Sequence, residues 1–217
     1  MVAAALGVTL AVPRQAVAQE SWFERLGIDK LRLTALGAQV GHVAPYGMKP
    51  TTSWSLVADY GEMVPGWRMV FNATYWGSRF RDRVVRAYAD SLESAIDDPT
   101  GDARVRLGDI TVSDIVLGAE VRRRYLPSAW IRPYVGGGLA IHVVNADGRL
   151  IDGTFVERAT DVVAAGISGA GGIDVRLHRH VALDAQARYD FLSLARFASL
   201  RVGAIYYFDP TQRSRTQ

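Results

Sequence analysis

Histidine and serine side chains in three strand-like segments are the candidates for acid–base or nucleophilic chemistry. His42 and His142 are predicted to face inward near one rim, and Ser53 and Ser55 begin the segment that follows His42. A serine hydroxyl activated by a neighbouring histidine is the arrangement that nucleophilic catalysis needs. No Ser–His–acid spacing is evident, and the two histidines fall on opposite walls of the predicted fold. The sequence therefore favours histidines that make ordinary hydrogen bonds, and it predicts no catalytic residue.

Two further segments carry metal-ligand chemistry. His178 and His180 flank Arg179 in a tight turn, but a metal there would need further ligands, which the sequence does not supply. Residues 97–102 read Asp-Asp-Pro-Thr-Gly-Asp, and carboxylate oxygens suit Ca²⁺. Proline and glycine at those positions are typical of a turn in a loop. We therefore expect neither a metal site nor a cofactor.

Charged side chains of both signs recur at every second position of several segments. If these positions face a closed interior, unpaired charge there would be costly, so carboxylates and guanidinium groups should pair. A solid core of ion pairs is the favoured interpretation, and a polar conduit is the alternative. The candidates for pairing are Arg68, Asp114, Glu120, Arg122, Asp184, Arg188 and Arg201, and the same inward parity collects Arg32, Asp59, Arg132, Asp174, Arg176 and Asp190.

Eight segments have the length and alternation of β-strands that would position these charges. Each is near or above the ~9–11 residues that a tilted strand needs to cross a bilayer. Tight turns at 62–66, 125–129 and 178–180 alternate with longer connections at 44–52, 77–109 and 145–161, as in barrels that keep their short turns at one rim. The predicted strands are 31–43, 53–61, 67–76, 110–124, 130–144, 162–177, 181–192 and 198–208.

Aromatic residues gather at the ends of the predicted strands. Two aromatic belts mark the two interfaces of a membrane, whereas a soluble sheet with one wet face would place aromatics in mid-strand as often as at strand ends. One belt contains Tyr60, Trp67, Tyr125, Trp130, Tyr206 and Phe208, and the other contains Trp54, Tyr75, Trp76, Tyr189 and Phe191. The sequence therefore favours a membrane barrel over a soluble β-protein.

The last predicted strand ends in a polar residue, a glycine two positions later and two closing aromatics: Arg201, Gly203, Tyr206 and Phe208. This pattern resembles the assembly signal of bacterial outer-membrane β-barrels, although nine residues follow Phe208 where many such proteins end. Residues 132–140, Arg-Pro-Tyr-Val-Gly-Gly-Gly-Leu-Ala, resemble the aromatic–glycine strand of small OmpA/OmpW-like barrels. The resemblance implies an outer-membrane location and contacts with the barrel-assembly machinery, outer-membrane lipid and lipopolysaccharide.

The two ends of the chain predict export. An apolar run at 2–12 precedes Ala16 and Ala18, which fit a small-x-small cleavage site, although the basic start of a signal peptide is missing. We expect a signal peptide at 1–18, a periplasmic lead-in at 19–30, the barrel at 31–208 and a periplasmic tail at 209–217. In the longest loop, residues 79–96 have near-helical apolar spacing, which indicates a short helix, with a projecting hairpin as the alternative.

Composition narrows the function further. The 217 residues carry a formal net charge of +3 and no cysteine, and no basic run interleaves with aromatics as in a nucleic-acid-binding surface.

The predicted fold is an eight-stranded antiparallel up-and-down transmembrane β-barrel. The favoured function is a non-enzymatic outer-membrane protein with a structural or surface-interaction role. The alternatives are a binding or transport barrel for small apolar molecules and an outer-membrane lipid-modifying enzyme. The sequence predicts neither a ligand nor an oligomeric state.

Overall fold

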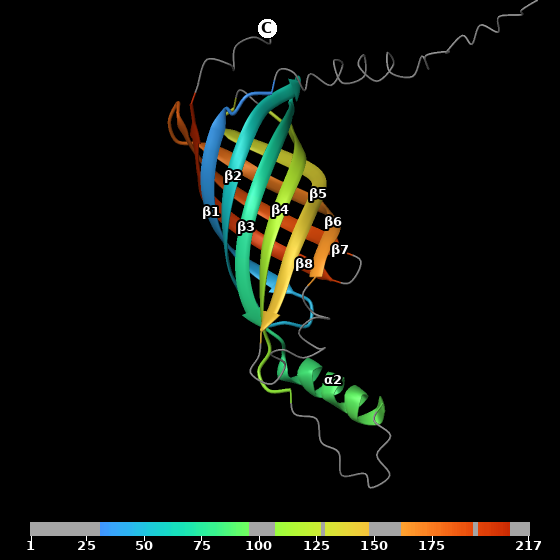
Figure 1. Cartoon of the computed structure of the whole chain (residues 1–217). Helices are drawn as coiled ribbons and strands as arrows, with labels where there is room; N and C mark the ends of the chain where they lie inside the picture. Colours follow the sequence, from blue (N-terminus) through green and yellow to red (C-terminus); the bar gives the residue numbers. More distant parts are fainter. Residues whose placement is uncertain (1–30, 96–106, 127–128, 148–161, 193–194, 209–217) are drawn as a thin grey trace, which may run out of the picture.

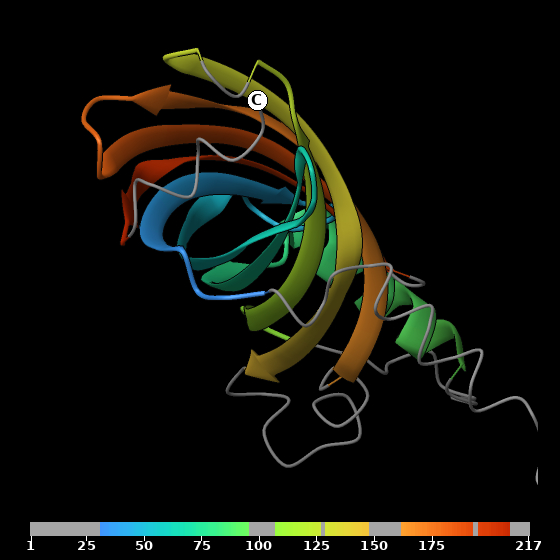
Figure 2. The same cartoon turned by 90° about the horizontal axis from the view of Figure 1, so that it is seen from above.

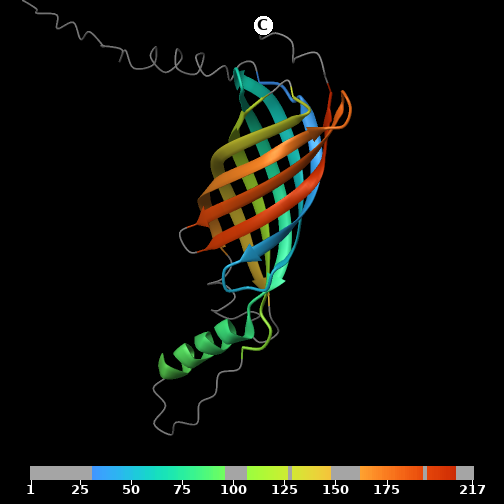
Figure 3. The same ribbon diagram turned by 180° about the vertical axis from the view of Figure 1, so that it is seen from behind.

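Eight antiparallel strands, each hydrogen-bonded to the next, close into a barrel where the last strand pairs with the first (Figures 1 and 3). The structure, a computed structural model, describes residues 31–95, 107–126, 129–147, 162–192 and 195–208. Figure 2 shows the strands curving around a common axis. The strands are β1 (Ala35–Pro45), β2 (Thr51–Val64), β3 (Trp67–Arg79), β4 (Thr111–Arg124), β5 (Ile131–Asp147), β6 (Val162–Arg176), β7 (Val181–Leu192) and β8 (Arg196–Tyr207).

All eight predicted strands are confirmed, and their bounds shift by a few residues. The end of β2 is one example, since this strand was expected to stop at Gly61 and continues to Val64. Gly61 has a φ of +86°, and the pairing with β3 shifts between Asp59 and Glu62. A bulge of this kind kinks a strand without ending it, which explains why glycine did not terminate β2.

The two faces of the wall are chemically inverted relative to a water-soluble protein. Leu56 and Leu139 point outward and are 66% and 68% exposed, whereas the inward-facing Asp114 and Asp174 are 0% exposed. Apolar side chains cover an exterior that suits hydrocarbon, and polar side chains fill the interior. Along β7 and β8, every buried position lies on the inward face and every exposed position on the outward face, which confirms the expected alternation.

The longest loop contains the helix α2 (Asp82–Ala95), so the helical prediction is confirmed and the hairpin alternative is wrong. Val85, Ala89 and Leu92 recur at helical spacing and pack against the end of the barrel. Among the described residues, no helix combines the length and the hydropathy that crossing a membrane requires.

The barrel has two distinct rims (Figure 1). The terminal rim is the end at which Ala35 of β1 pairs with Tyr207 of β8. The helix rim is the opposite end, where β3 leads into α2. The predicted segments 1–18, 19–30 and 209–217 lie outside the described residues, as do the acidic segment 97–102 and most of the loop at 145–161.

Candidate functional site

The bore near the terminal rim is filled by a network of ion pairs. Asp59 accepts hydrogen bonds from Arg68 at 2.8 Å and lies 3.6 Å from the guanidinium of Arg124. Arg124 also contacts Asp174 at 2.7 Å, and Arg132 lies 3.6 Å from the same carboxylate. We call these five residues the terminal network. Every carboxylate of the terminal network faces at least one guanidinium, so attraction between opposite charges offsets the free-energy cost of burying them in the bore.

A second group of charges occupies the middle of the bore. Glu120 lies 2.7 Å from Arg122 and 3.3 Å from Arg188, and Arg188 lies 2.8 Å from Asp190. All four side chains are buried. The contact between Glu120 and Arg188 joins β4 to β7, which are separated by β5 and β6 in the wall, so the ion pairs also link strands that are not neighbours.

Asp184 has neutral partners. The hydroxyl of Tyr134 donates a hydrogen bond to it at 2.8 Å, and the amide of Gln39 donates a second. Tyr134 reaches it across Gly172, where an added Cβ would lie 2.6 Å from the tyrosine ring. Gln39 crosses Gly203, where an added Cβ would lie 2.6 Å from the Gln39 backbone. Gly203 of the predicted assembly signal therefore also makes room for an interior hydrogen bond.

The helix rim is filled by apolar side chains. His142 hydrogen-bonds Asp114 at 2.7 Å through Nδ1, and its ring stacks on Phe197 with centroids 5.3 Å apart. The ring of Phe197 in turn packs against the ring of Trp76, with centroids 5.4 Å apart. We call the surrounding buried set the helix-rim cluster; it comprises Val43, Met48, Trp76, Ala89, Leu107, Ile110, Val112, Ala146 and Phe197. This cluster joins inward strand positions to α2 and the segment that returns from it.

Three sequence-based placements are wrong. His42 points outward and is exposed, because the inward positions of β1 are Ala35, Gly37, Gln39, Gly41 and Val43. Trp76 was expected in an aromatic belt, but it is 2% exposed and lies inside the bore. Arg32 was expected to face inward and is exposed just before β1.

The outward position of His42 separates it from the two serines that follow it. Ser53 and Ser55 are buried on the inner face of β2, whereas His42 is exposed on the outer face of β1. A hydroxyl and an imidazole on opposite sides of a sheet cannot exchange a proton directly. His142 does face inward, but the hydrogen bond recorded for its ring goes to an aspartate and not to a serine.

Three of the predicted ion-pair residues lack the expected arginine–carboxylate contact. Asp114 pairs with a histidine, and Asp184 is bound by a tyrosine and an amide. Arg201 is 4% exposed, and among the described residues no carboxylate lies within ion-pair distance of it. Its stem crosses Gly41, where an added Cβ would lie 2.7 Å from Arg201 Cγ. Arg68, Glu120, Arg122 and Arg188 all form ion pairs.

The remaining predicted residues lie at the terminal rim. Tyr206 and Phe208 point outward, 51% and 46% exposed, with ring centroids 5.8 Å apart. His180 Nδ1 donates a hydrogen bond to the carbonyl oxygen of Tyr207 at 2.9 Å, and the His180 ring stacks on Tyr206 with centroids 5.7 Å apart. Within the described residues, no group of three His, Cys, Asp or Glu side chains could hold a metal ion.

Sequence reasoning missed several interior residues. Arg124 ends its strand among three consecutive arginines, and only its parity with Arg122 marks it as inward-facing. Tyr134 and Gln39 are neutral, so a search for alternating charges could not find them. The parity of Gln39 with the inward glycines of β1 is the signal that could have identified it.

Comparisons with known proteins identify the fold. No protein-family model and no curated protein sequence matches the chain. Among solved structures, Neisserial surface protein A is similar with a TM-score of 0.55 and 15% identity, covering 80% of this chain and 96% of that protein. OprG from Pseudomonas aeruginosa has a TM-score of 0.48 and 13% identity over 83% of this chain and 99% of its own. The attachment invasion locus protein Ail of Yersinia pestis has a TM-score of 0.45 and 14% identity over 81% and 97%. The closed barrel of β1 to β8, together with the similarity to Neisserial surface protein A, shows that the chain has the eight-stranded fold of outer-membrane β-barrel proteins.

Proposed function

We propose that this chain is a non-enzymatic outer-membrane β-barrel of a Gram-negative-type bacterium with a structural or surface-interaction role. The observation that carries the proposal is the inverted wall, with exposed leucines outside and paired charges inside. An eight-stranded barrel is just wide enough for its own side chains to fill it. In this proposal the terminal rim is periplasmic and the helix rim faces the cell exterior.

The surface role rests on how α2 is held. Its apolar side chains enter the helix-rim cluster, Arg81 Nε donates to the carbonyl of Met48 at 2.8 Å, and Lys49 contacts Asp82 at 3.3 Å. The opposite side of the helix, including Arg83 and Arg86, is exposed. A helix anchored in this way presents a defined polar face at the mouth of the barrel.

Planar-bilayer recording tests the filled bore. We expect no steady ion conductance from the intact barrel, because the terminal network and the helix-rim cluster occupy both ends of the interior. The matched control is protein that has been heat-denatured before addition. A reproducible open channel from the folded barrel would overturn the proposal and favour a conduit.

We also propose that the barrel-assembly machinery recognises Tyr206 and Phe208. Both rings are exposed on the outward face of β8, where a second protein can reach them. Changing both to alanine should reduce insertion into the outer membrane while leaving export intact. The control is Leu200→Ala with Val202→Ala, two outward apolar residues of the same strand. If the two double variants insert equally well, Tyr206 and Phe208 are not the residues that the assembly machinery recognises.

A binding or transport barrel for small apolar molecules is the second candidate. The observation that favours it is the apolar lining of the bore at the helix rim, formed by Val43, Trp76 and Phe197. Toward the helix rim, the described pairing of β6 with β7 stops at Gly166 and Leu192, so Val162–Ala165 of β6 have no described partner on β7. A lateral gap between these two strands would favour the entry of apolar molecules. Saturable binding of an alkane or a long-chain alcohol that Phe197→Ala changes and Arg83→Gln leaves unaltered would raise this candidate above the first.

A further inference from the structure

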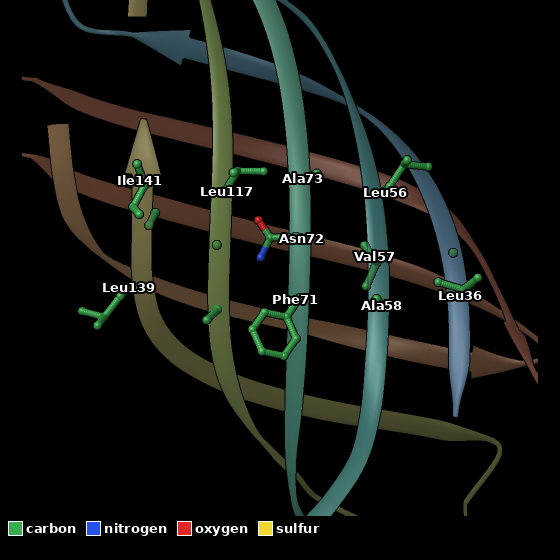
Figure 4. Close-up of a pocket in the computed structure, with 14 residues that line it drawn as sticks. Leu36, Leu56, Val57, Ala58, Phe71, Asn72, Ala73, Leu117, Leu139 and Ile141 are labelled. Atoms are coloured by element: carbon green, nitrogen blue, oxygen red, sulfur yellow. The ribbon is translucent and has the colours of Figure 1, made fainter. Parts of the chain in front are cut away.

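A groove of about 530 Å³ runs over the outer surface of β1 to β5 (Figure 4). Its walls are Leu36, Leu56, Phe71, Leu117, Leu139 and Ile141. Its floor is lowered by alanines that alternate with these large side chains from strand to strand. Ala58 pairs with Phe71, Phe71 pairs with Ala119, and Leu56 pairs with Ala73. This surface is therefore hollowed between the large side chains.

A polar pocket of about 620 Å³ lies farther along the same strands, toward the helix rim. On β3 the outward positions pass from Phe71 and Ala73 in the groove to Gly77 and Arg79 in the pocket. Gly77 lies beside the hydroxyl of Tyr75, at an ordinary contact distance of 3.7 Å for an added Cβ, and both residues line the pocket. The groove and the pocket thus follow each other along one side of the barrel.

The charges at the pocket suit a phosphate. Lys49 and Arg79 contribute two cations to its lining, and Asp147 contributes one carboxylate. The existing partners of the two cations are Asp82, 3.3 Å from Lys49, and Asp109, 3.7 Å from Arg79. All four side chains are about half exposed or more, and exposed pairs of this kind contribute little. A phosphate can therefore replace these contacts with stronger charge-assisted hydrogen bonds.

The rest of the pocket suits sugar hydroxyls. Asn145 and Ser113 pair across β4 and β5 on the outward face, and Asp147 lies two positions beyond Asn145. An amide, a hydroxyl and a carboxylate together can donate to and accept from a saccharide. A phospholipid headgroup without a sugar would use the two cations but offer these three groups fewer hydroxyls than a saccharide does.

We propose that this face binds one phosphorylated glycolipid of the outer leaflet. An acyl chain lies in the groove over Ala73, the phosphate lies between Lys49 and Arg79, and the sugar hydroxyls meet Asn145 and Asp147. The inference rests on the proposed outer-membrane location, because only there does the helix rim meet a leaflet of such lipids. It extends that proposal by assigning a specific lipid site to one side of the barrel.

Native mass spectrometry of the refolded barrel in detergent tests the headgroup. The probes are bisphosphorylated lipid A, its dephosphorylated form, and phosphatidylglycerol of matched acyl length. We expect the wild type to retain bisphosphorylated lipid A about tenfold better than either other lipid, the size of effect typical of charge-assisted contacts. Lys49→Gln with Arg79→Gln should remove this preference, whereas Arg83→Gln with Arg86→Gln on α2 should preserve it.

A second pair of variants tests the groove. Ala73→Trp should fill it and weaken binding of all acylated probes, whereas Ala187→Trp, an outward alanine of β7 on another side, should not. Equal retention of the three lipids, or equal loss in test and control variants, would overturn the site. The heat-dependent gel shift of a folded barrel is measured on every sample. Normal folding without lipid preference contradicts only the lipid site, whereas failure to fold in lipid or detergent contradicts the proposed function.

Discussion

The two ends of the bore are closed by different physics. At the terminal rim, Asp59 and Asp174 are held by three arginines, and each group depends on a partner of opposite charge. At the helix rim, Trp76 and Phe197 exclude water by apolar packing. Removing one member of a charge network lowers the folding stability strongly, because its partner stays buried and unpaired. Shortening a side chain in an apolar cluster lowers the stability in proportion to the volume removed, and the cluster can partly collapse into the space.

The largest effect should come from breaking the terminal network. Asp174→Ala leaves Arg124 and Arg132 without this carboxylate, and removing one partner of a buried ion pair typically costs about 3–5 kcal/mol. Urea unfolding of the barrel in lipid vesicles, followed by tryptophan fluorescence, measures the loss. Asp147→Ala at the exposed helix rim is the control and should leave the unfolding free energy nearly unchanged. Equal stability of the two variants would show that the network is not what holds this end.

A smaller effect is expected at the helix rim. Phe197→Ala removes contacts with Trp76 and His142, and we expect a loss of about 2–3 kcal/mol, below the range for a fully enclosed phenylalanine because the rim can relax. The variant should still show no steady conductance, since the ion pairs beneath it remain. An open channel in this variant would mean that the helix-rim cluster alone closes the bore and that the terminal network does not.

The smallest effect concerns the ion pair that attaches α2. The hydrogen bond from Lys49, together with its charge, holds the pKa of Asp82 below its ordinary value of 3.8. The pair therefore stabilises the fold above pH 3.8 and loses that contribution as the pH falls through the lowered pKa. An NMR titration of the Asp82 carboxyl should show the low value, and Lys49→Gln should raise it. An unchanged pKa in that variant would assign the shift to the helix N-terminus instead.

Strand number, strand order and most faces could be predicted from the sequence because alternation is a local property. On β7, Leu183 and Asp184 differ in polarity, and their positions on opposite faces follow from the period of two. His42 was misplaced because β1 has glycine and alanine at several inward positions. Where small residues occupy both faces, polarity no longer indicates which one is buried.

Specific partners inside the bore could not be predicted. Whether Arg201 pairs with a carboxylate depends on the stagger between strands and on how far each side chain reaches across the interior. The contact between Asp114 and His142 joins positions 28 residues apart, and that between Gln39 and Asp184 joins positions 145 apart. Such contacts depend on barrel closure, which alternation within one strand does not encode.

Depth-dependent fluorescence quenching tests the central claim, an apolar exterior that faces lipid, most directly. The chain has no cysteine, so Leu139→Cys and Leu183→Cys each give one labelling site, on different sides of the barrel. With an environment-sensitive dye at either position, we expect blue-shifted emission and strong quenching by lipids that carry a quencher deep in the acyl chain. A dye at Tyr46→Cys, exposed beyond β1 at the helix rim, should be quenched mainly by a water-soluble agent. Water-like emission from both leucine sites, with no quenching by lipid, would contradict the membrane-spanning barrel.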